Sequence, residues 1–288
     1  MTASRPVLRV VDAPRQLEGE GFEVRRPFPS GALAMVDPFL LLDEMGPKDT
    51  APGGAIGTGD HPHRGFETVT YMLDGEFEHR DSAGNHGVIR PGDVQWMTAG
   101  AGVVHSEKPS ADFLARGGRM HGFQLWVNLP RADKLRAPRY QDLRAEDLPK
   151  VDRYGVHATV IAGDALGVHG PADTFVPIVY VHARLDAGAS VSIPTEPDWN
   201  AFVYAIGGAG VVGRDRRPVR DGQAAVLGEG ESIELRAGDE SLEALVLAGR
   251  PLHEPVARYG PFVMNTKQEI IDAIEDFQAG RMGAIAAR

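Results

Sequence analysis

Short apolar runs separated by turn-forming residues occupy most of the chain. The runs ETVTYML, VQWMTAG and FQLWVNL contain β-branched and aromatic residues, and Gly, Pro or Asp follows each of them closely. Alternating patterns of this kind are typical of half-buried strands, whereas helical periodicity is nearly absent until the C-terminal end. The pattern therefore predicts an all-β protein made of many short strands.

The C-terminal end carries one segment with helical spacing. Thr266-Lys-Gln-Glu269 has the form of a capping box, in which a hydroxyl and a carboxylate satisfy backbone N–H groups reciprocally. The apolar positions that follow at helical spacing are Ile270, Ile271, Ile274 and Phe277. Gly280 then supplies a stop signal, so one short C-terminal helix is predicted.

A polar, charged and proline-bearing stretch at residues 131–155 separates two strand-rich halves. Such a shift in composition predicts a connection between domains. We expect an N-terminal domain spanning residues 1–135 and a C-terminal domain spanning residues 136–288 that includes the helix.

The two halves share a weak internal repeat. Aligning Tyr71 of TYMLDGEF with Tyr204 of VYAIGGAG also aligns Gly75 with Gly208, and the turn sequence RPGD has a rough counterpart in RDGQ. The identities are few, but the rhythm of strands and turns agrees. The repeat predicts two β-barrels or sandwiches in tandem.

Composition narrows the classes of function. The net charge of −10 argues against broad electrostatic binding to nucleic acid or to anionic membrane, and no cysteine is present to form a disulfide or a thiolate metal site. Any metal must then be held by histidine and carboxylate side chains. The first residues lack the apolar core of a signal peptide, and no stretch approaches the ~18 apolar residues of a membrane span. We therefore expect a cytoplasmic protein.

The strongest chemical signal is the segment HPHRGFE. Side chains two apart on a strand point to the same face, so His61, His63 and, in a regular strand, Glu67 would face one way. Two imidazoles on one face suit a divalent transition metal. Pro62 fits an edge or irregular strand, where its missing N–H matters least.

A second segment, GAGVVHSE, lies about forty residues further on and follows Pro-Gly-Asp. Its His105 and Glu107 have the same spacing of two. A single histidine is usually a hydrogen-bonded core residue, but the two segments together are far more specific for a metal site. From spacing alone, either Glu67 or Glu107 could supply the carboxylate. Four ligands would leave two positions of a six-coordinate ion open for chemistry.

These segments resemble a known family. HPHRGFE and PGD followed by GAGVVH resemble the two cupin motifs, and HPHRGFETVTY, RPGDVQWMTAGAGVVHSE, HGFQLWVNLP and GPFVMNT together resemble the pirins, a bicupin family. The resemblance is dense between about residues 56 and 130 and returns at Tyr259 to Thr266. It implies two tandem cupin β-barrels of jelly-roll type with one metal in the N-terminal barrel.

The resemblance also implies the ligands. The family's metal-binding positions are matched by His61, His63, His105 and Glu107. Glu67 would then lie outside the ligand set, orienting an imidazole, and Gln124 is a candidate for a similar supporting contact. Further candidates for the pocket wall are Met97, Phe123 and Trp126, although alternation along FQLWVNL prevents all of them from facing inward.

The second half lacks an equivalent ligand set. The repeat alignment places Pro194, Glu196 and roughly Leu235 at the positions of His61, His63 and His105. The remaining histidines there lack ligand spacing, so we expect one metal per chain. GAGVVG at 208–213 matches a dinucleotide-binding pattern, but the charged, proline-containing continuation favours a hairpin rather than a helix.

The implied activity is oxidative cleavage of a flavonol such as quercetin by dioxygen. Fe(II) is the first choice of metal, and Mn, Co, Ni or Cu also suit the donor set. Glu107 is the candidate acceptor for the substrate's hydroxyl proton. A metal- or redox-sensing regulator that binds a protein partner without catalysis is the alternative, and a sugar or small-acid isomerase a third. We expect a monomer with no direct contact to nucleic acid.

Overall fold

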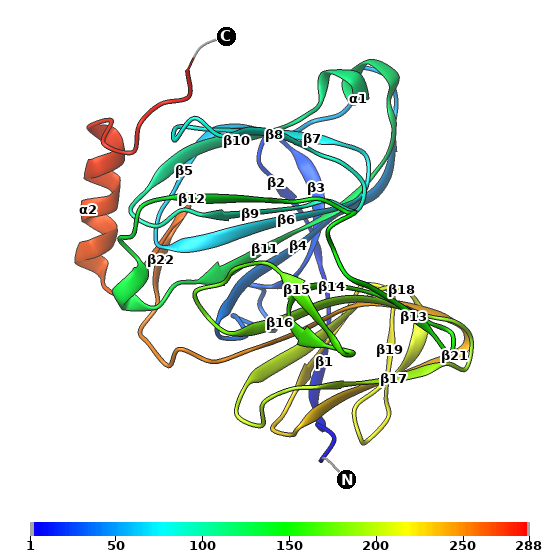
Figure 1. Ribbon diagram of the computed structural model, residues 1–288. Helices are drawn as coiled ribbons and strands as arrows, with labels where there is room; N and C mark the ends of the chain where they lie inside the picture. Colours follow the sequence, from blue (N-terminus) through cyan, green and yellow to red (C-terminus); the bar gives the residue numbers. More distant parts are fainter. Residues whose placement is uncertain (1–2, 287–288) are drawn as a thin grey trace. The chain divides into compact units, whose positions relative to one another are not determined.

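The computed structural model describes residues 3–286, and strands make up most of it (Figure 1). The described residues contain two α-helices, the short α1 (Ala111–Arg116) and the C-terminal α2 (Lys267–Gln278). A single 3₁₀ turn, η1 (Arg131–Asp133), lies in the polar stretch between the strand-rich halves. The all-β class predicted from the alternating pattern is confirmed.

The chain forms two compact units, and each of them is a cupin β-barrel. The first barrel comprises Arg15–Arg26, Leu41–Ala145 and His253–Arg288. The second barrel comprises Met1–Pro14, Pro27–Leu40 and Glu146–Leu252.

Two antiparallel sheets make the body of the first barrel. The seven-stranded sheet runs in the order β12 (Arg139–Leu143), β9 (Val94–Thr98), β6 (Phe66–Asp74), β11 (Gly118–Asn128), β4 (Phe39–Thr50), β3 (Phe22–Phe28) and β2 (Arg15–Glu18). The four-stranded sheet runs in the order β5 (Thr58–His63), β10 (Val103–Pro109), β7 (Phe77–Asp81) and β8 (His86–Ile89). A small ribbon of β22 (Ala257–Tyr259) and β23 (Phe262–Met264) is added from the C-terminal end.

A ten-stranded sheet builds the second barrel. Its main path is β1 (Val7–Asp12), β20 (Gln223–Leu227), β18 (Asn200–Val212), β21 (Ser232–Gly249), β16 (Ile178–Leu185), β14 (Val156–Ala165) and β13 (Lys150–Arg153). Three more strands branch from it: β15 (Val168–Pro171), β17 (Ser190–Pro194) and β19 (Arg217–Arg220). The long strand β21 pairs with β17 through its first part and with β16 through its last part, so it serves both sides of the barrel.

Each of the two units is made of three separate segments of the chain, so no single boundary in the sequence divides them. The expected boundary after residue 135 lies ten residues before the crossing at Ala145 and Glu146, and the chain crosses back to the first barrel after Leu252. Strand β1 pairs with β20 of the second barrel, whereas α2 packs on the first barrel through Ile270 and Ala273 against Phe262 and Met264. The helix that we assigned to the C-terminal domain therefore belongs to the barrel formed by the N-terminal half.

Helix α2 begins as its sequence predicts. The Thr266 side chain accepts a hydrogen bond from the backbone N–H of Glu269, and the Glu269 carboxylate accepts one from the N–H of Thr266 at 2.8 Å. Ile270 is buried, whereas Ile271 is 47% exposed and Phe277 40% exposed. The apolar stripe is therefore only partly covered, and the capping box contributes to fixing the start of the helix.

The internal repeat has a counterpart in strand pairing. Strand β6 pairs with β9 and β11, and the corresponding β18 pairs with β20 and β21. Gly75 follows β6, and Gly208 lies at an irregularity in β18; both have positive φ. The turn glycines Gly92 and Gly222, which precede β9 and β20, also have positive φ. The weak sequence similarity thus marks equivalent positions of two related barrels.

A buried lysine ties the C-terminal segment to the first barrel. Lys134 Nζ donates to the carbonyls of Gly65 and Val263, at 2.8 and 3.1 Å, and to Asn128 Oδ1 at 2.7 Å. Burial lowers the pKa of Lys134 to about 8. Gly65 has φ +87°, and a Cβ there would meet the Val263 carbonyl oxygen at 2.0 Å, so the turn after HPHR requires glycine.

In the described residues, the helices lack the length and apolar character that crossing a bilayer requires.

Candidate metal centre and its pocket

Three histidines converge inside the first barrel. His61 and His63 lie on β5, and His105 lies opposite His61 on the neighbouring antiparallel strand β10. One nitrogen from each imidazole lies within 4.8 Å of the others. The spacing of two residues places His61 and His63 on one face, and strand pairing adds His105, so the three rings can surround a single ion.

Hydrogen bonds orient two of these rings. His61 Nδ1 lies 2.7 Å from the Gly59 carbonyl oxygen, and His63 Nδ1 lies 3.2 Å from that of Pro261. A carbonyl oxygen can only accept, so both Nδ1 atoms carry a proton, and Nε2 is the nitrogen of each ring that can face a metal. Pro261 lies nearly two hundred residues from His63 in sequence, so its contact with the centre depends on the tertiary fold.

Two ring nitrogens of the histidine cluster are buried without a hydrogen-bond partner. They are His63 Nε2 and His105 Nε2. Burial, followed by the nearby histidines, lowers the pKa of both His63 and His105 well below 6.5, so both imidazoles are neutral near pH 7. Neutral imidazoles with unsatisfied lone pairs are the form that binds a transition metal, and the cluster therefore fits such an ion.

Behind His105 lies a buried histidine–carboxylate pair that sequence reasoning missed. His79 Nδ1 lies 3.5 Å from His105 Nδ1, and His79 Nε2 lies 3.2 Å from Asp81 Oδ2. His79 is fully buried, and Asp81 also accepts from the backbone and side chain of Asn85. The spacing of two in FEHRD could have indicated this pair, because β7 lies beside β10.

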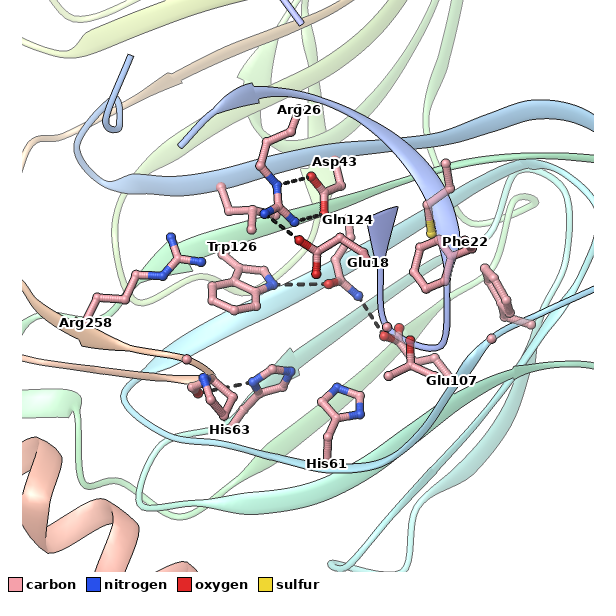
Figure 2. A pocket seen from close by; sticks show the side chains of 18 residues that line it. Glu18, Phe22, Arg26, Asp43, His61, His63, Glu107, Gln124, Trp126 and Arg258 are labelled. Atoms are coloured by element: carbon pink, nitrogen blue, oxygen red, sulfur yellow. Dashed lines mark hydrogen bonds and ion pairs between the residues drawn. The ribbon is translucent and has the colours of Figure 1, made fainter. Parts of the chain in front are cut away.

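Glu107 lies on the wall of the same pocket. The strand pairing shifts between His105 and Glu107, which are therefore not a simple continuation of one register. Glu107 Oε1 accepts from Thr70 Oγ1 at 2.7 Å. Its Oε2 accepts from Gln124 Nε2, also at 2.7 Å (Figure 2). The carboxylate is 7% exposed and is held in place from the opposite sheet.

Glu67 faces the other way. It pairs with Thr98 across β6 and β9, accepts a hydrogen bond from Thr98 Oγ1 at 2.7 Å, and lies 3.8 Å from Arg139. Thr68 and Thr70 follow it on the strand at odd spacings and therefore point to the opposite face, toward the pocket. Of the two candidate carboxylates, Glu107 is the one that lines the pocket with His61 and His63.

The pocket is a cavity of about 470 Å³ between the two sheets of the first barrel. Its apolar walls include Phe22, Leu41, Met45, Phe77 and Trp126. Gln124 and Trp126 both line it, as the alternation along β11 allows, and Trp126 Nε1 donates to Gln124 Oε1 at 3.2 Å. The other two wall candidates are buried elsewhere: Phe123 lies on the opposite face of β11, and Met97 packs with Ala99 and Val103.

Charged side chains form the part of the pocket away from the histidines (Figure 2). Arg26 makes a two-pronged contact with Asp43, with N–O distances of 2.6 and 2.5 Å, and lies 2.7 Å from Glu18. Burial raises the pKa of Asp43, and Arg26 opposes this effect. Arg258 of β22 lies over the ring of Trp126, 4.6 Å from its centroid. No local sequence motif marks this charged group, because its members come from the four separate strands β2, β3, β4 and β22.

Comparison with known proteins identifies the fold and the family. The family model for Pirin matches residues 21–127, and that for the Pirin C-terminal cupin domain matches residues 180–283. Pirin from Rattus norvegicus is 44% identical, with 100% of this chain and 97% of the relative covered. A putative quercetin 2,3-dioxygenase from Pseudomonas aeruginosa is 45% identical over 94% of this chain and 95% of its own length.

Solved structures agree with this comparison. Quercetin 2,3-dioxygenase from Acinetobacter baumannii is 41% identical with a TM-score of 0.92, and the match covers 99% of this chain and 100% of that one. A bacterial pirin from Escherichia coli in complex with nickel(II) has the same fold, with a TM-score of 0.64 at 18% identity over 84% and 98% of the two chains. The chain is therefore a member of the pirin family, a bicupin with a histidine cluster suited to a metal in its first barrel.

Proposed function

We propose that this protein is a metal-dependent dioxygenase that cleaves a flavonol such as quercetin with O2. The observation that carries the proposal is the set of buried imidazoles with free Nε2 lone pairs beside a cavity of about 470 Å³. This volume is within the range of about 300–1,000 Å³ that small-molecule sites occupy. Similarity to two quercetin 2,3-dioxygenases, one of them putative, supports the choice of reaction.

We assign His61, His63, His105 and Glu107 as the metal ligands. Each carboxylate oxygen of Glu107 has a second lone pair, so it can keep its hydrogen bonds from Thr70 and Gln124 while binding a metal. Three nitrogens and one oxygen suit Fe(II), our first choice, as well as Mn, Co, Ni or Cu. A bound metal would act as a Lewis acid toward the chelating hydroxyl and carbonyl of the flavonol.

The protein's own groups then have distinct tasks. Glu107 accepts the proton of the substrate hydroxyl, and the hydrogen bonds from Thr70 and Gln124 hold its carboxylate in the wall of the cavity. Trp126 and Phe22 bury the planar rings and exclude water from the reacting carbons. His79 and Asp81 keep His105 oriented from behind.

Turnover tests the reaction directly. The purified protein is loaded with Fe(II), Mn, Co, Ni or Cu, and loss of flavonol absorbance is followed together with oxygen uptake. Stoichiometric consumption of O2 and quercetin with at least one metal is expected. Absence of turnover with every metal would refute the dioxygenase. Metal dependence without oxygen uptake would indicate an isomerase instead.

Metal content tests the ligand assignment. His61→Ala is expected to lose bound metal by elemental analysis, while His169→Ala, an exposed histidine of the second barrel paired with Asp164, keeps it. Glu107→Gln is expected to weaken metal binding and Glu67→Gln to retain it, because Glu67 faces away from the cavity. Equal metal content in His61→Ala and the unmodified protein would contradict the site.

A regulatory role is the second candidate. The identity to rat Pirin, 44%, is nearly the same as that to the bacterial putative dioxygenase, 45%, so similarity alone favours neither role. In this case the protein would be a cytoplasmic monomer that senses metal or redox state and binds a protein partner. Light scattering of the purified chain tests the monomer, and the turnover assay separates the regulator from the enzyme.

A further inference from the structure

The polar stretch between the strand-rich halves supplies one buried cation, Lys134. It follows the 3₁₀ turn η1 and is only 1% exposed. An ammonium group has three N–H donors, and the acceptors in contact with Nζ are the carbonyl oxygens of Gly65 and Val263 together with Asn128 Oδ1. Each donor therefore has an acceptor, and all of these acceptors are neutral.

Stability alone does not explain a cation buried in this way. Burial lowers the pKa of Lys134 to about 8, although the carboxylates of Glu254 and Glu269 oppose this effect, so the ammonium form predominates at pH 7. Replacing buried ionic groups by apolar side chains of similar volume is often neutral or stabilising. The charge at this position therefore points to a task beyond holding the fold together.

Two of the acceptors belong to the segments that set the position of His63. Gly65 follows His63 by two residues, and Val263 follows Pro261 by two residues. The Pro261 carbonyl accepts from His63 Nδ1 at 3.2 Å. The Val263 N–H also donates to the Arg64 carbonyl at 3.1 Å, so the ribbon of β22 and β23 contacts the turn after His63. The lysine thus connects the segments that carry the two partners of the hydrogen bond that orients this ring.

The third acceptor adds the strand beside the same ring. Asn128 lies on β11 two residues after Trp126, whose ring centroid is 5.2 Å from that of His63 (Figure 2). Residues two apart on a strand share a face, so Asn128 continues the face of β11 that carries Trp126. One ammonium group therefore joins three segments at His63: the turn after it, the C-terminal ribbon and β11.

We propose that Lys134 is a positioning residue of the metal centre, whose ammonium group holds these three segments so that His63 Nε2 faces the histidine cluster. This inference rests on the proposed assignment of His63 as a metal ligand, and it does not depend on the reaction. Without the ammonium group, the Pro261 carbonyl would be held less firmly at the ring. The imidazole would then exchange between its two tautomers, one of which carries the proton on the nitrogen that must bind the metal.

The tautomer of His63 in the metal-free protein tests this role directly. Long-range ¹H–¹⁵N NMR of protein labelled with ¹⁵N-histidine distinguishes Nδ1–H from Nε2–H, and His63→Ala identifies the signals of this ring. The unmodified protein is expected to show the Nδ1–H form alone. Lys134→Met, which has a long side chain without donors, is expected to show both forms. The Nδ1–H form alone in Lys134→Met would overturn the proposal.

Nickel affinity provides the second readout. Lys134→Met is expected to bind Ni(II) about ten- to hundredfold more weakly, as is typical for loss of a group that orients a metal ligand. Competition with a chromophoric chelator measures the affinity.

The matched control is Met282→Ala, which creates a cavity in the apolar cluster that α2 and β23 share. It should lower the Tm but leave both the His63 tautomer and the nickel affinity unchanged. Equal losses of affinity in Met282→Ala and Lys134→Met would show that stability decides metal binding, and would overturn the positioning role.

Chemical rescue separates the charge of the side chain from the space that it fills. Lys134→Ala lacks the side chain beyond Cβ, so added propylammonium matches the deleted atoms, whereas propanol matches only their volume. Propylammonium is expected to restore the Nδ1–H form of His63 and part of the nickel affinity, and propanol is not. Equal effects of the two compounds, or no effect of either, would overturn the role of the ammonium group.

These measurements use neither flavonol nor O2, so they separate the role of Lys134 from the proposed reaction. Absence of turnover with every metal would refute the dioxygenase and leave the tautomer and affinity results unaffected. Thermal unfolding of each variant shows whether the fold is intact.

Discussion

The two barrels share a pattern of strand pairing, but they differ in the polarity of the side chains in their interiors. On the pocket side of β6 and β9 the first barrel places Thr68, Thr70 and Gln95, together with the buried histidines. The repeat alignment puts Ala201, Val203 and Ala225 at those positions of the second barrel, and all three belong to a single aliphatic core.

The two interiors differ in the kinds of side chain that they bury. The second barrel buries a large aliphatic cluster, which includes Leu235 near the position that matches His105. The first barrel keeps imidazole nitrogens buried without partners, an arrangement that is unfavourable unless something binds them. One copy of the fold therefore packs an aliphatic cluster in its interior, whereas the other has a cavity lined partly by polar side chains.

The largest effect is expected from making the first barrel resemble the second. His105→Leu removes one of three clustered imidazoles, so metal affinity should fall more than about a hundredfold, whereas the metal-free protein should remain folded because an unsatisfied buried nitrogen is removed. Elemental analysis and unfolding curves with and without a chelator measure both quantities. Chelation should lower the Tm of the unmodified protein but not that of the variant. Retained metal in His105→Leu would show that this difference between the two barrels does not determine metal binding.

The reciprocal change is expected to damage the second barrel. Leu235→His buries a polar ring at a position that is 1% exposed, and it should reduce the free energy of unfolding by about 2–4 kcal/mol. Denaturant unfolding measures the loss, and Val191→Ala, at a partly buried position beside the same core, provides a milder control. A gain of bound metal in Leu235→His would show that the second barrel is closer to a site than its core indicates.

A smaller effect is expected behind the cluster. His79→Phe keeps a ring against Tyr140 but removes the link between Asp81 and His105, so metal affinity should fall by about ten- to hundredfold. Competition with a chromophoric chelator measures the affinity. The control is His86→Phe on neighbouring β8, whose side chain is 54% exposed, and it should bind metal normally. Identical affinities in the two variants would contradict an orienting role for His79.

The smallest effect is expected at the C-terminal helix. Thr266→Ala removes one half of the capping box and should cost about 1 kcal/mol of stability. Because α2 packs on the first barrel, hydrogen exchange should increase at β22 and β23 while the second barrel stays protected. Thr266→Ser should preserve the cap. Faster exchange confined to the second barrel would contradict the packing of α2 on the first barrel.

Much of the site could be predicted from sequence because its signals are local. His61 and His63 share a face through strand alternation alone, and the capping box needs only the four residues from Thr266 to Glu269. The repeat of turn glycines was also visible, since positive φ favours glycine wherever the same turn recurs.

Other features could not be predicted from the sequence, because they depend on contacts between distant segments. Spacing left Glu67 and Glu107 equivalent, and strand pairing shows that only Glu107 faces the cavity. His79 of β7 contacts His105, and Arg258 of the C-terminal ribbon contacts Trp126. No pattern within either segment specifies the neighbour that it contacts.

The sequence by itself determined the all-β class, the three histidines and the start of α2, because alternation and capping act over a few residues. Tertiary structure alone decided which carboxylate lines the pocket, which barrel receives α2, and how the Pro261 carbonyl orients His63. These choices depend on sheet register and on the path of the chain between two units, and both are set by packing among residues far apart in sequence.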